Sequence, residues 1–327
     1  MRRRAFFGVM GAAAWPLVGR AEQAGLRRVG LLMSSAENDP VARLRFNFFV
    51  QSLKSLGWTE GRTISIDVRW PGADLERIQQ SAIELVALQC DVIVTTSTPT
   101  TAAVQRETAR TPIVFTNVSD PVGEGFVSSL ANPGRNITGF INYESSIAGK
   151  WVQLLKEIDP RVTRAAILFN PETAPRGGSY FGDPFEAAAR SLGIIPVAAP
   201  VRSDADIEAA ISAIGREPGG GLVVASDSFI GIHRAQFIEC AARYRVPAVY
   251  PFRAPVEGGL LSYGPDTAEF YRPLGPYVDR ILKGKQANEL PVQVPTKTEL
   301  VINLRVAKTL GLDVPVSLLG RADEVLE

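Results

Sequence analysis

DVIVTTSTP, at residues 91–99, is a short apolar run that leads through a cluster of hydroxyl side chains into the start of a helix. Residues 91–96 have the composition of a strand. Pro99 suits the first position of the helix predicted over 99–109, because the N–H that proline lacks is unpaired there in any case. Strand and helix patterns alternate in the same way on both sides, as in parallel βαβ units. The sequence therefore predicts an α/β chain with doubly wound, Rossmann-like sheets.

The strand and helix patterns form a first unit around this stretch. Its helices have apolar residues every three or four positions. In the first helix these residues are Val41, Leu44, Phe48, Phe49, Leu53 and Leu56. The predicted strands of the unit lie at 29–33, 63–70, 91–96 and 112–116.

The pattern then starts again at Trp151 and predicts a second unit. Asp183, Pro184 and Glu186 resemble the N-cap, first-turn proline and capping-box acid of one of its helices, which places 177–181 in a loop with two aromatic residues. Ser203 can cap the helix predicted over 204–214. The predicted strands lie at 165–169, 193–201, 221–225 and 246–250.

Further segments follow the second unit. Residues 260–263 are predicted as a strand, and 266–283 as a helix interrupted by Pro273, Gly275 and Pro276. A last strand and helix occupy 300–310, with Asn303 as the helix cap. These segments must be shared between two lobes.

The first residues have the pattern of an export signal. Arg2 to Arg4 precede an apolar stretch, 5–18, that is too short to span a bilayer, and small residues at 19–21 suit cleavage. Arg3-Arg4-Ala5-Phe6-Phe7 fits the twin-arginine pattern, with the Sec route as the alternative. No cysteine lies near the cleavage site. We therefore expect residues 1–21 to be removed and the remainder to work in the periplasm without an anchor or membrane insertion.

Composition excludes several classes of function. Without the four arginines of the leader, 31 basic residues face 34 acidic ones, so a nucleic-acid partner is not expected. His233 is the only histidine, which leaves no Ser-His-Asp, Cys-His or histidine-rich metal site. We predict no metal, no cofactor and no catalytic residue. The two cysteines, Cys90 and Cys240, indicate buried free thiols or at most one disulfide.

Polar and aromatic residues gather where the predicted strands end, which is where open α/β sheets bind ligands. Hydroxyls at 96–98 either cap the helix that follows or help its N-terminus to bind a carboxylate. Asp227 either caps a helix or accepts hydrogen bonds from a ligand ammonium group. Asp120 and Asp227 could also form a carboxylate pair for acid–base chemistry, although nothing in the sequence raises their pKa values. The candidate ligand-binding residues are Ser34, Thr96, Ser97, Thr98, Asn117, Asp120, Asn170, Tyr180, Asp227, Phe229 and Tyr250.

Four fragments identify a family resemblance. They are DPVG at 120–123, NPGRNITG at 132–139, LVIN at 300–303 and RADEV at 321–325. With them, the chain from about Arg28 to its C-terminus resembles the ABC-transporter substrate-binding proteins related to the tryptophan and tyrosine binders. That family has the type I periplasmic-binding-protein fold.

The resemblance implies a division into lobes joined by three crossings. The first lobe would comprise 28–140 with about 262–288, and the second 141–261 with about 289–327. Residues 96–99 match the family's carboxylate-side loop, and Asp227 matches an acid of the second lobe's ligand loop. Residues 177–181 are an insertion relative to the amino-acid binders.

The resemblance also implies a function. The chain would be the periplasmic component of an ABC importer, a monomer that closes two lobes on a small-molecule solute and delivers it to the permease subunits. The expected solute is an organic anion or zwitterion, aromatic or amino-acid-like. A periplasmic ligand-sensing module and an exported enzyme that uses cleft carboxylates remain as alternatives.

Replacing Arg3 and Arg4 with lysine tests the export route. A twin-arginine signal requires the arginine pair, so the double variant should accumulate as precursor in the cytoplasm. Fractionation and immunoblotting measure this. Mature protein at normal level in the periplasm would instead indicate the Sec route.

Overall fold

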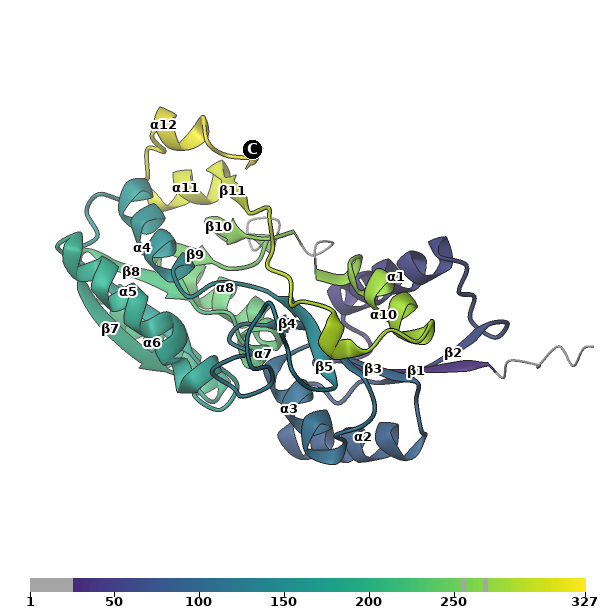
Figure 1. Ribbon diagram of the computed structural model, residues 1–327. Coiled ribbons are helices and arrows are strands. Elements are labelled where there is room, and N and C mark those ends of the chain that lie inside the picture. Colours follow the sequence, from purple (N-terminus) through teal and green to yellow (C-terminus); the bar gives the residue numbers. More distant parts are fainter. Residues whose placement is uncertain (1–25, 254–256, 267–269) are drawn as a thin grey trace, which may run out of the picture.

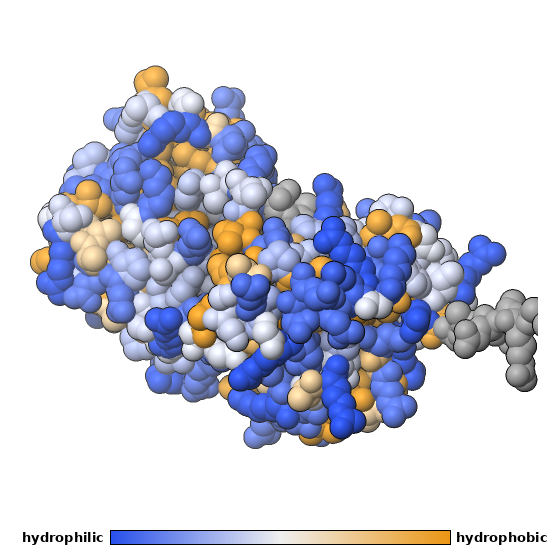
Figure 2. Space-filling view, in the orientation of Figure 1, coloured by the Kyte–Doolittle hydropathy of each residue, from blue (hydrophilic) through white to orange (hydrophobic). Residues whose placement is uncertain are grey.

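The apolar runs form two mostly parallel sheets, one in each of two lobes (Figure 1). The computed structural model describes residues 26–253, 257–266 and 270–327, so the predicted leader lies outside the described residues. None of the helices in these ranges is long and apolar enough to cross a membrane. On the face shown in Figure 2, hydrophilic side chains predominate, and hydrophobic ones are scattered among them.

The first sheet is entirely parallel, with strand order β2-β1-β3-β4-β5. Successive strand residues face opposite sides. Leu31 therefore packs with helices α1 and α10, whereas Leu32 packs with α2 and α3. The elements are β1 (Arg27–Leu32), α1 (Pro40–Ser55), β2 (Ile64–Arg69), α2 (Leu75–Ala87), β3 (Val92–Thr95), α3 (Thr98–Glu107), β4 (Ile113–Val118), β5 (Ile137–Ile141) and α10 (Leu274–Leu282).

The second sheet has the order β12-β11-β10-β9-β8-β6-β7, and only β10 and β11 are antiparallel. Ser203 and Asn303 cap α6 and α11, as predicted. The strands are β6 (Arg164–Phe169), β7 (Ile195–Pro200), β8 (Gly220–Val224), β9 (Ala248–Tyr250), β10 (Leu261–Gly264), β11 (Glu299–Asn303) and β12 (Glu324–Leu326). The helices are α4 (Ile147–Ile158), α5 (Ser179–Ser191), α6 (Asp204–Gly215), α7 (Ser228–Ile232), α8 (Arg234–Arg243), α11 (Leu304–Leu310) and α12 (Val316–Leu319).

Helix α5 begins one turn earlier than predicted. Its N-cap is Gly178 and not Asp183, and Pro184 lies inside the helix. Phe181 is fully buried and its ring centroid lies 5.4 Å from that of Trp151. This burial offsets the hydrogen bond that Pro184 cannot donate. Tyr180 and Phe181 therefore belong to a helix, and the prediction of a long loop over 177–181 is wrong.

The chain passes between the sheets three times, after β5, after β10 and before β11. Two short segments lie on the other side of the predicted boundaries. Residues 262–264 belong to β10 and hence to the second sheet, because β10 pairs with β9 and β11. Residues 290–293 instead lie with the first lobe, where the Gln293 N–H donates to the Gly139 carbonyl at 2.9 Å.

Helix α10 crosses α1 at a glycine. A Cβ on Gly275 would lie 2.2 Å from Ser52 Oγ, and the Ser52 hydroxyl itself donates to the Arg272 carbonyl at 2.7 Å. The close approach lets Leu274 and Val278 of α10 enter the core of the first lobe. Pro273 precedes α10, whereas Gly275 and Pro276 lie in its first turn and do not interrupt it. Residues 267–269 of the predicted helix lie outside the described residues.

Gly275→Ala should destabilise the protein by about 1–3 kcal/mol, because the added methyl group overpacks the α1–α10 crossing. The matched control is Gly182→Ala in α5, where nothing lies within 4 Å of the new Cβ. That change should be neutral or stabilise by up to about 1 kcal/mol through helix propensity. Chemical denaturation measures both. Equal stabilities would contradict the close packing of α10 on α1.

Candidate ligand-binding site

A cavity of about 280 Å³ lies between the lobes, at the carboxyl ends of the parallel strands. Loops at these ends converge there because every strand of a parallel sheet points to the same edge. Three residues predicted as ligand contacts, Ser34, Asn117 and Asp227, line it. The full lining is Ser34, Ser35, Val41, Leu44, Arg45, Asn117, Tyr143, Ala225, Ser226, Asp227, Ser228, Ile230, Gly231, Arg234, Pro251, Phe252, Arg253, Glu257, Pro265 and Phe270.

Three aromatic residues line the cavity. Tyr143 is buried, and its ring lies 6.3 Å from that of Phe270 in an edge-to-face arrangement. Its hydroxyl donates to the Pro251 carbonyl. Burial raises the pKa of Tyr143, so this hydroxyl stays a neutral donor. Phe252 supplies another ring from the second lobe. The wall suits a flat apolar group.

Two asparagines connect polar groups of the two lobes. Asn142 Nδ2 donates to Asn117 Oδ1 at 3.0 Å and to Ser226 Oγ at 3.3 Å. Asn117 has a φ of 56°, a left-handed conformation that asparagine tolerates better than most residues. Asn117 lies next to the last residue of β4, where the pairing with β5 is irregular, and it lines the cavity. The amide and hydroxyl groups of the wall therefore come from both lobes.

Asp227 is the N-cap of α7. Its carboxylate accepts from the Ile230 N–H at 2.8 Å, the Asn170 N–H at 3.0 Å and the Thr173 hydroxyl at 3.0 Å. Burial raises its pKa to about 6, although these hydrogen bonds oppose the shift. No local feature of the sequence indicates this shift, because the fold produces it by desolvating the carboxylate. Of the two roles considered for Asp227, the geometry shows the cap.

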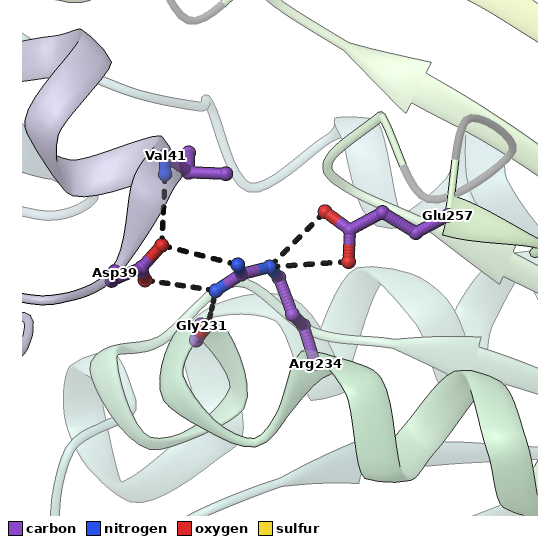
Figure 3. A network of polar contacts seen from close by, with 5 residues as sticks. All are labelled: Asp39, Val41, Gly231, Arg234 and Glu257. Atoms are coloured by element: carbon purple, nitrogen blue, oxygen red, sulfur yellow. Dashed lines mark hydrogen bonds and ion pairs between the residues drawn. The ribbon is translucent and has the colours of Figure 1, made fainter.

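An ion-pair network joins the lobes beside the cavity (Figure 3). Arg234 of α8 binds Asp39 of α1 with distances of 2.9 and 3.1 Å, and its Nε lies 3.1 Å from Glu257. Asp39 is also the N-cap of α1 and accepts from the Val41 N–H at 2.9 Å. Burial would raise the pKa of Asp39, but Arg234 holds it below the usual value. The network thus links the N-terminus of α1 in the first lobe to α8 in the second.

A second ion pair joins the lobes at another crevice. Asp120 Oδ2 lies 2.5 Å from Arg176 Nε, and Asp120 Oδ1 accepts from the Gly123 N–H at 2.9 Å. A Cβ at position 123 would lie 2.1 Å from Asp120 Oδ2. The glycine of the DPVG fragment therefore leaves room for this contact. Each carboxylate of the pair considered for catalysis therefore has its own partners, Arg176 for Asp120 and backbone N–H groups for Asp227.

The other predicted contacts lie outside the main cavity. Thr96, Ser97, Phe229 and Tyr250 are buried, and the Thr96 hydroxyl donates to the Leu32 carbonyl at 3.2 Å. Tyr250 belongs to the core of the second lobe, and Phe229 stacks on His233. Thr98 lines a small hollow with Asn117 and Asp227.

Asn170 and Tyr180 do not line the main cavity, but they form hydrogen bonds to residues next to its wall or in it. Asn170 Oδ1 accepts from the Glu172 and Thr173 N–H groups and so shapes the loop that holds Asp227. The Tyr180 hydroxyl donates to the Tyr143 carbonyl at 3.1 Å, and burial raises its pKa to about 12.

Sequence reasoning missed several residues of the cavity, chiefly Arg45, Tyr143, Arg234 and Phe270. Arg45 follows Val41 and Leu44 at helical spacing, and the apolar pattern of α1 predicts that this face packs into the core. Leu44 is 48% exposed, which shows that part of the stripe faces the cleft. An arginine within an apolar stripe was the signal available in the sequence. Tyr143 and Phe270 depend on the crossings, for which no local pattern exists.

Both cysteines are buried and free, Cys90 in the first lobe and Cys240 in the second. This agrees with the expected thiols. No cluster of three or more metal-ligating side chains occurs among the residues that the structure describes.

Comparison with known proteins adds the family. The sequence model of the protein family described as ABC transporter substrate binding protein matches residues 28–326 of this chain. The chain belongs to this family. Members of the ABC transporter substrate binding protein family bind small-molecule solutes, and the resemblance drawn from the four fragments is confirmed.

Individual relatives of this ABC transporter substrate binding protein agree. It is 26% identical to a tyrosine-binding protein of Clostridioides difficile (strain R20291) over 265 residues, 81% of this chain and 75% of that protein. A conserved domain protein from Vibrio cholerae is 29% identical with a TM-score of 0.84, covering 91% of this chain and 99% of that one. An ABC domain from Streptococcus pneumoniae in complex with L-Trp is 24% identical with a TM-score of 0.84, covering 92% and 100%. The predicted fold, that of a type I periplasmic binding protein, is confirmed.

The raised pKa of Asp227 predicts a pH dependence of stability. Between the ordinary value of 3.8 and the folded value of about 6, the folded protein holds a proton that the unfolded chain has released. The free energy of unfolding should therefore fall as pH rises through this window, by on the order of 3 kcal/mol.

Asp227→Asn should remove this fall while keeping an oxygen for the Ile230 N–H. Denaturation from pH 4 to pH 7 measures it. The control is Asp74→Asn at the exposed N-cap of α2, which should keep the wild-type slope. A wild-type slope in Asp227→Asn would exclude this carboxylate as the source.

Proposed function

We propose that this protein is the periplasmic solute-binding component of an ABC importer and delivers its ligand to the permease subunits. The observation that carries the proposal is a cavity whose wall comes from both lobes and is bordered by an inter-lobe ion pair. A ligand enclosed there contacts both lobes only when they are closed, so binding shifts the population toward the closed state. The permease can then distinguish loaded from empty protein.

The proposed ligand is a small organic anion or zwitterion, aromatic or amino-acid-like. The wall combines aromatic and aliphatic side chains with polar and charged groups, and this combination supports the class. The relatives whose names specify tyrosine and L-Trp support it as well. The candidate contacts retained from the sequence are Ser34, Asn117 and Asp227, the last in addition to its role as the cap of α7.

The proposed activity is binding of the solute without catalysis of a reaction. Asp120 is paired with Arg176 and Asp227 with backbone N–H groups, which argues against an exported enzyme that uses this carboxylate pair. The export signal inferred for residues 1–21 supports a periplasmic location, and we propose that the mature protein acts as a monomer.

The identity of the ligand can be tested directly. Mature protein purified without refolding should release a small aromatic or amino-acid-like acid on denaturation, which mass spectrometry can identify. The same compound should lower the radius of gyration in small-angle scattering. Turnover of the compound would favour an enzyme, and an unchanged radius would contradict lobe closure.

The ion pairs of Figure 3 provide a second test of closure. Asp39→Asn keeps the α1 cap but removes the inter-lobe charge pair, worth about 1.5–3 kcal/mol. Ligand-free Asp39→Asn should therefore be more open in small-angle scattering. Glu257→Gln also removes one carboxylate from Arg234, but Glu257 lies in the second lobe with it. Glu257→Gln should therefore give the same scattering as the wild type. If Asp39→Asn and Glu257→Gln open the protein equally, the ion pair between Asp39 and Arg234 does not hold the lobes together.

A further inference from the structure

Three arginines reach the cavity, and the protein neutralises two of them. Arg234 binds Asp39 and Glu257, as Figure 3 shows. Arg253 binds Glu299 at 2.9 Å and also Glu324. The third, Arg45, has no carboxylate partner anywhere in the described part of the chain. The cavity therefore contains one guanidinium whose charge the described residues leave unbalanced.

Helix α1 holds Arg45 at the aromatic side of the cavity. Its guanidinium carbon lies 5.8 Å from the centre of the Tyr271 ring. Its positive charge also favours ionisation of Tyr143 and Tyr271, against the burial that raises their pKa values. The Nε atom of Arg45 is buried and has no hydrogen-bond partner. A buried donor without a partner is costly and is rare in folded proteins.

We propose that Arg45 binds the carboxylate of the transported ligand. A guanidinium presents parallel N–H groups that fit the two oxygens of a carboxylate, and such charge-assisted pairs are among the stronger hydrogen bonds. The ligand would supply the missing negative charge at the side of the guanidinium that lines the cavity. This assignment rests on the proposed solute-binding function and narrows its ligand class to carboxylates.

The loop expected to receive the carboxylate offers fewer donors. The Ser97 and Thr100 hydroxyls lie 3.0 Å apart, and the Ser97 N–H donates to Thr100 Oγ1 at 3.0 Å. The Thr96 hydroxyl donates to the Leu32 carbonyl. These groups satisfy one another within the first lobe, and Thr96 and Ser97 are buried. The open guanidinium of Arg45 is the better match for an anion.

The neighbours of Arg45 indicate what is attached to the carboxylate. Val41 and Leu44 lie four and one residues before it on α1 and also line the cavity, as does Phe270. A carboxylate held by Arg45 would therefore have an apolar body beside these side chains. Aromatic amino acids and the corresponding acids without the amino group share this chemistry.

Matched compounds separate these possibilities in calorimetric titration. One set is L-tryptophan, indole-3-propionate and tryptamine, and the other is L-tyrosine, 3-(4-hydroxyphenyl)propionate and tyramine. We expect at least one carboxylate-bearing compound to bind and neither amine to do so. Preference for the propionates would identify an anion as the ligand, and preference for the amino acids a zwitterion.

Arg45→Gln should weaken binding of the best carboxylate about 30-fold or more, and Arg45→Lys should weaken it less because the charge remains. Arg43→Gln makes the same charge change on the exposed face of α1, where Arg43 pairs with Glu37, and should leave affinity unchanged. Ligand-free Arg45→Gln should melt no lower than the wild type, because it loses an unpaired buried donor. This melting curve separates lost binding from lost folding.

The outcomes distinguish the two proposals. Wild-type affinity in Arg45→Gln, or equal binding of the amines, would overturn the role of Arg45 and leave the solute-binding function intact. Binding of none of the six compounds would overturn the aromatic carboxylate as ligand class. If the solute identified by mass spectrometry then still compacts the protein, the solute-binding function survives.

Discussion

Burial of both faces of two mostly parallel sheets is the constraint on which the rest of this structure depends. Leu31 and Leu32, adjacent in β1, enter different cores, so helices must cover both sides of the sheet. Once the faces are covered, the carboxyl ends of the strands are where loops can vary without disturbing the core. The loops of the two sheets meet at these ends, and the cavity lies between them.

The charges around the cavity follow a consistent arrangement. Carboxylates at the ends of other elements hold Arg234 and Arg253, which therefore contribute to the contact between segments of the fold. Asp227 is occupied by the backbone of its own lobe. Arg45 alone keeps unused hydrogen-bonding capacity beside aromatic rings. Charged groups that serve the fold thus have a partner within the protein, whereas the guanidinium proposed to bind the ligand does not.

Local patterns predicted the fold better than they predicted the site. Ser203 and Asn303 were found as caps because a cap and its helix are neighbours in sequence. Ser34, Asn117 and Asp227 were predicted to lie at the cavity because each lies at the end of a strand, which the local sequence also shows. Exposure of Leu44 and Arg45 depends on how the second lobe lies over α1, and the early start of α5 depends on Trp151, a residue of another helix. Long-range packing of this kind leaves no local signal.

The triple passage of the chain between the lobes also affects the order in which parts of the protein can fold during synthesis. Leu274, Tyr277 and Val278 complete the core around β1 and α1, yet they are synthesised more than two hundred residues later. On the ribosome the N-terminal half of the chain therefore cannot reach its final packing until α10 has emerged, by which time most of the second sheet is available. Folding of the two lobes is coupled by this delay, and neither lobe can be produced by simple truncation.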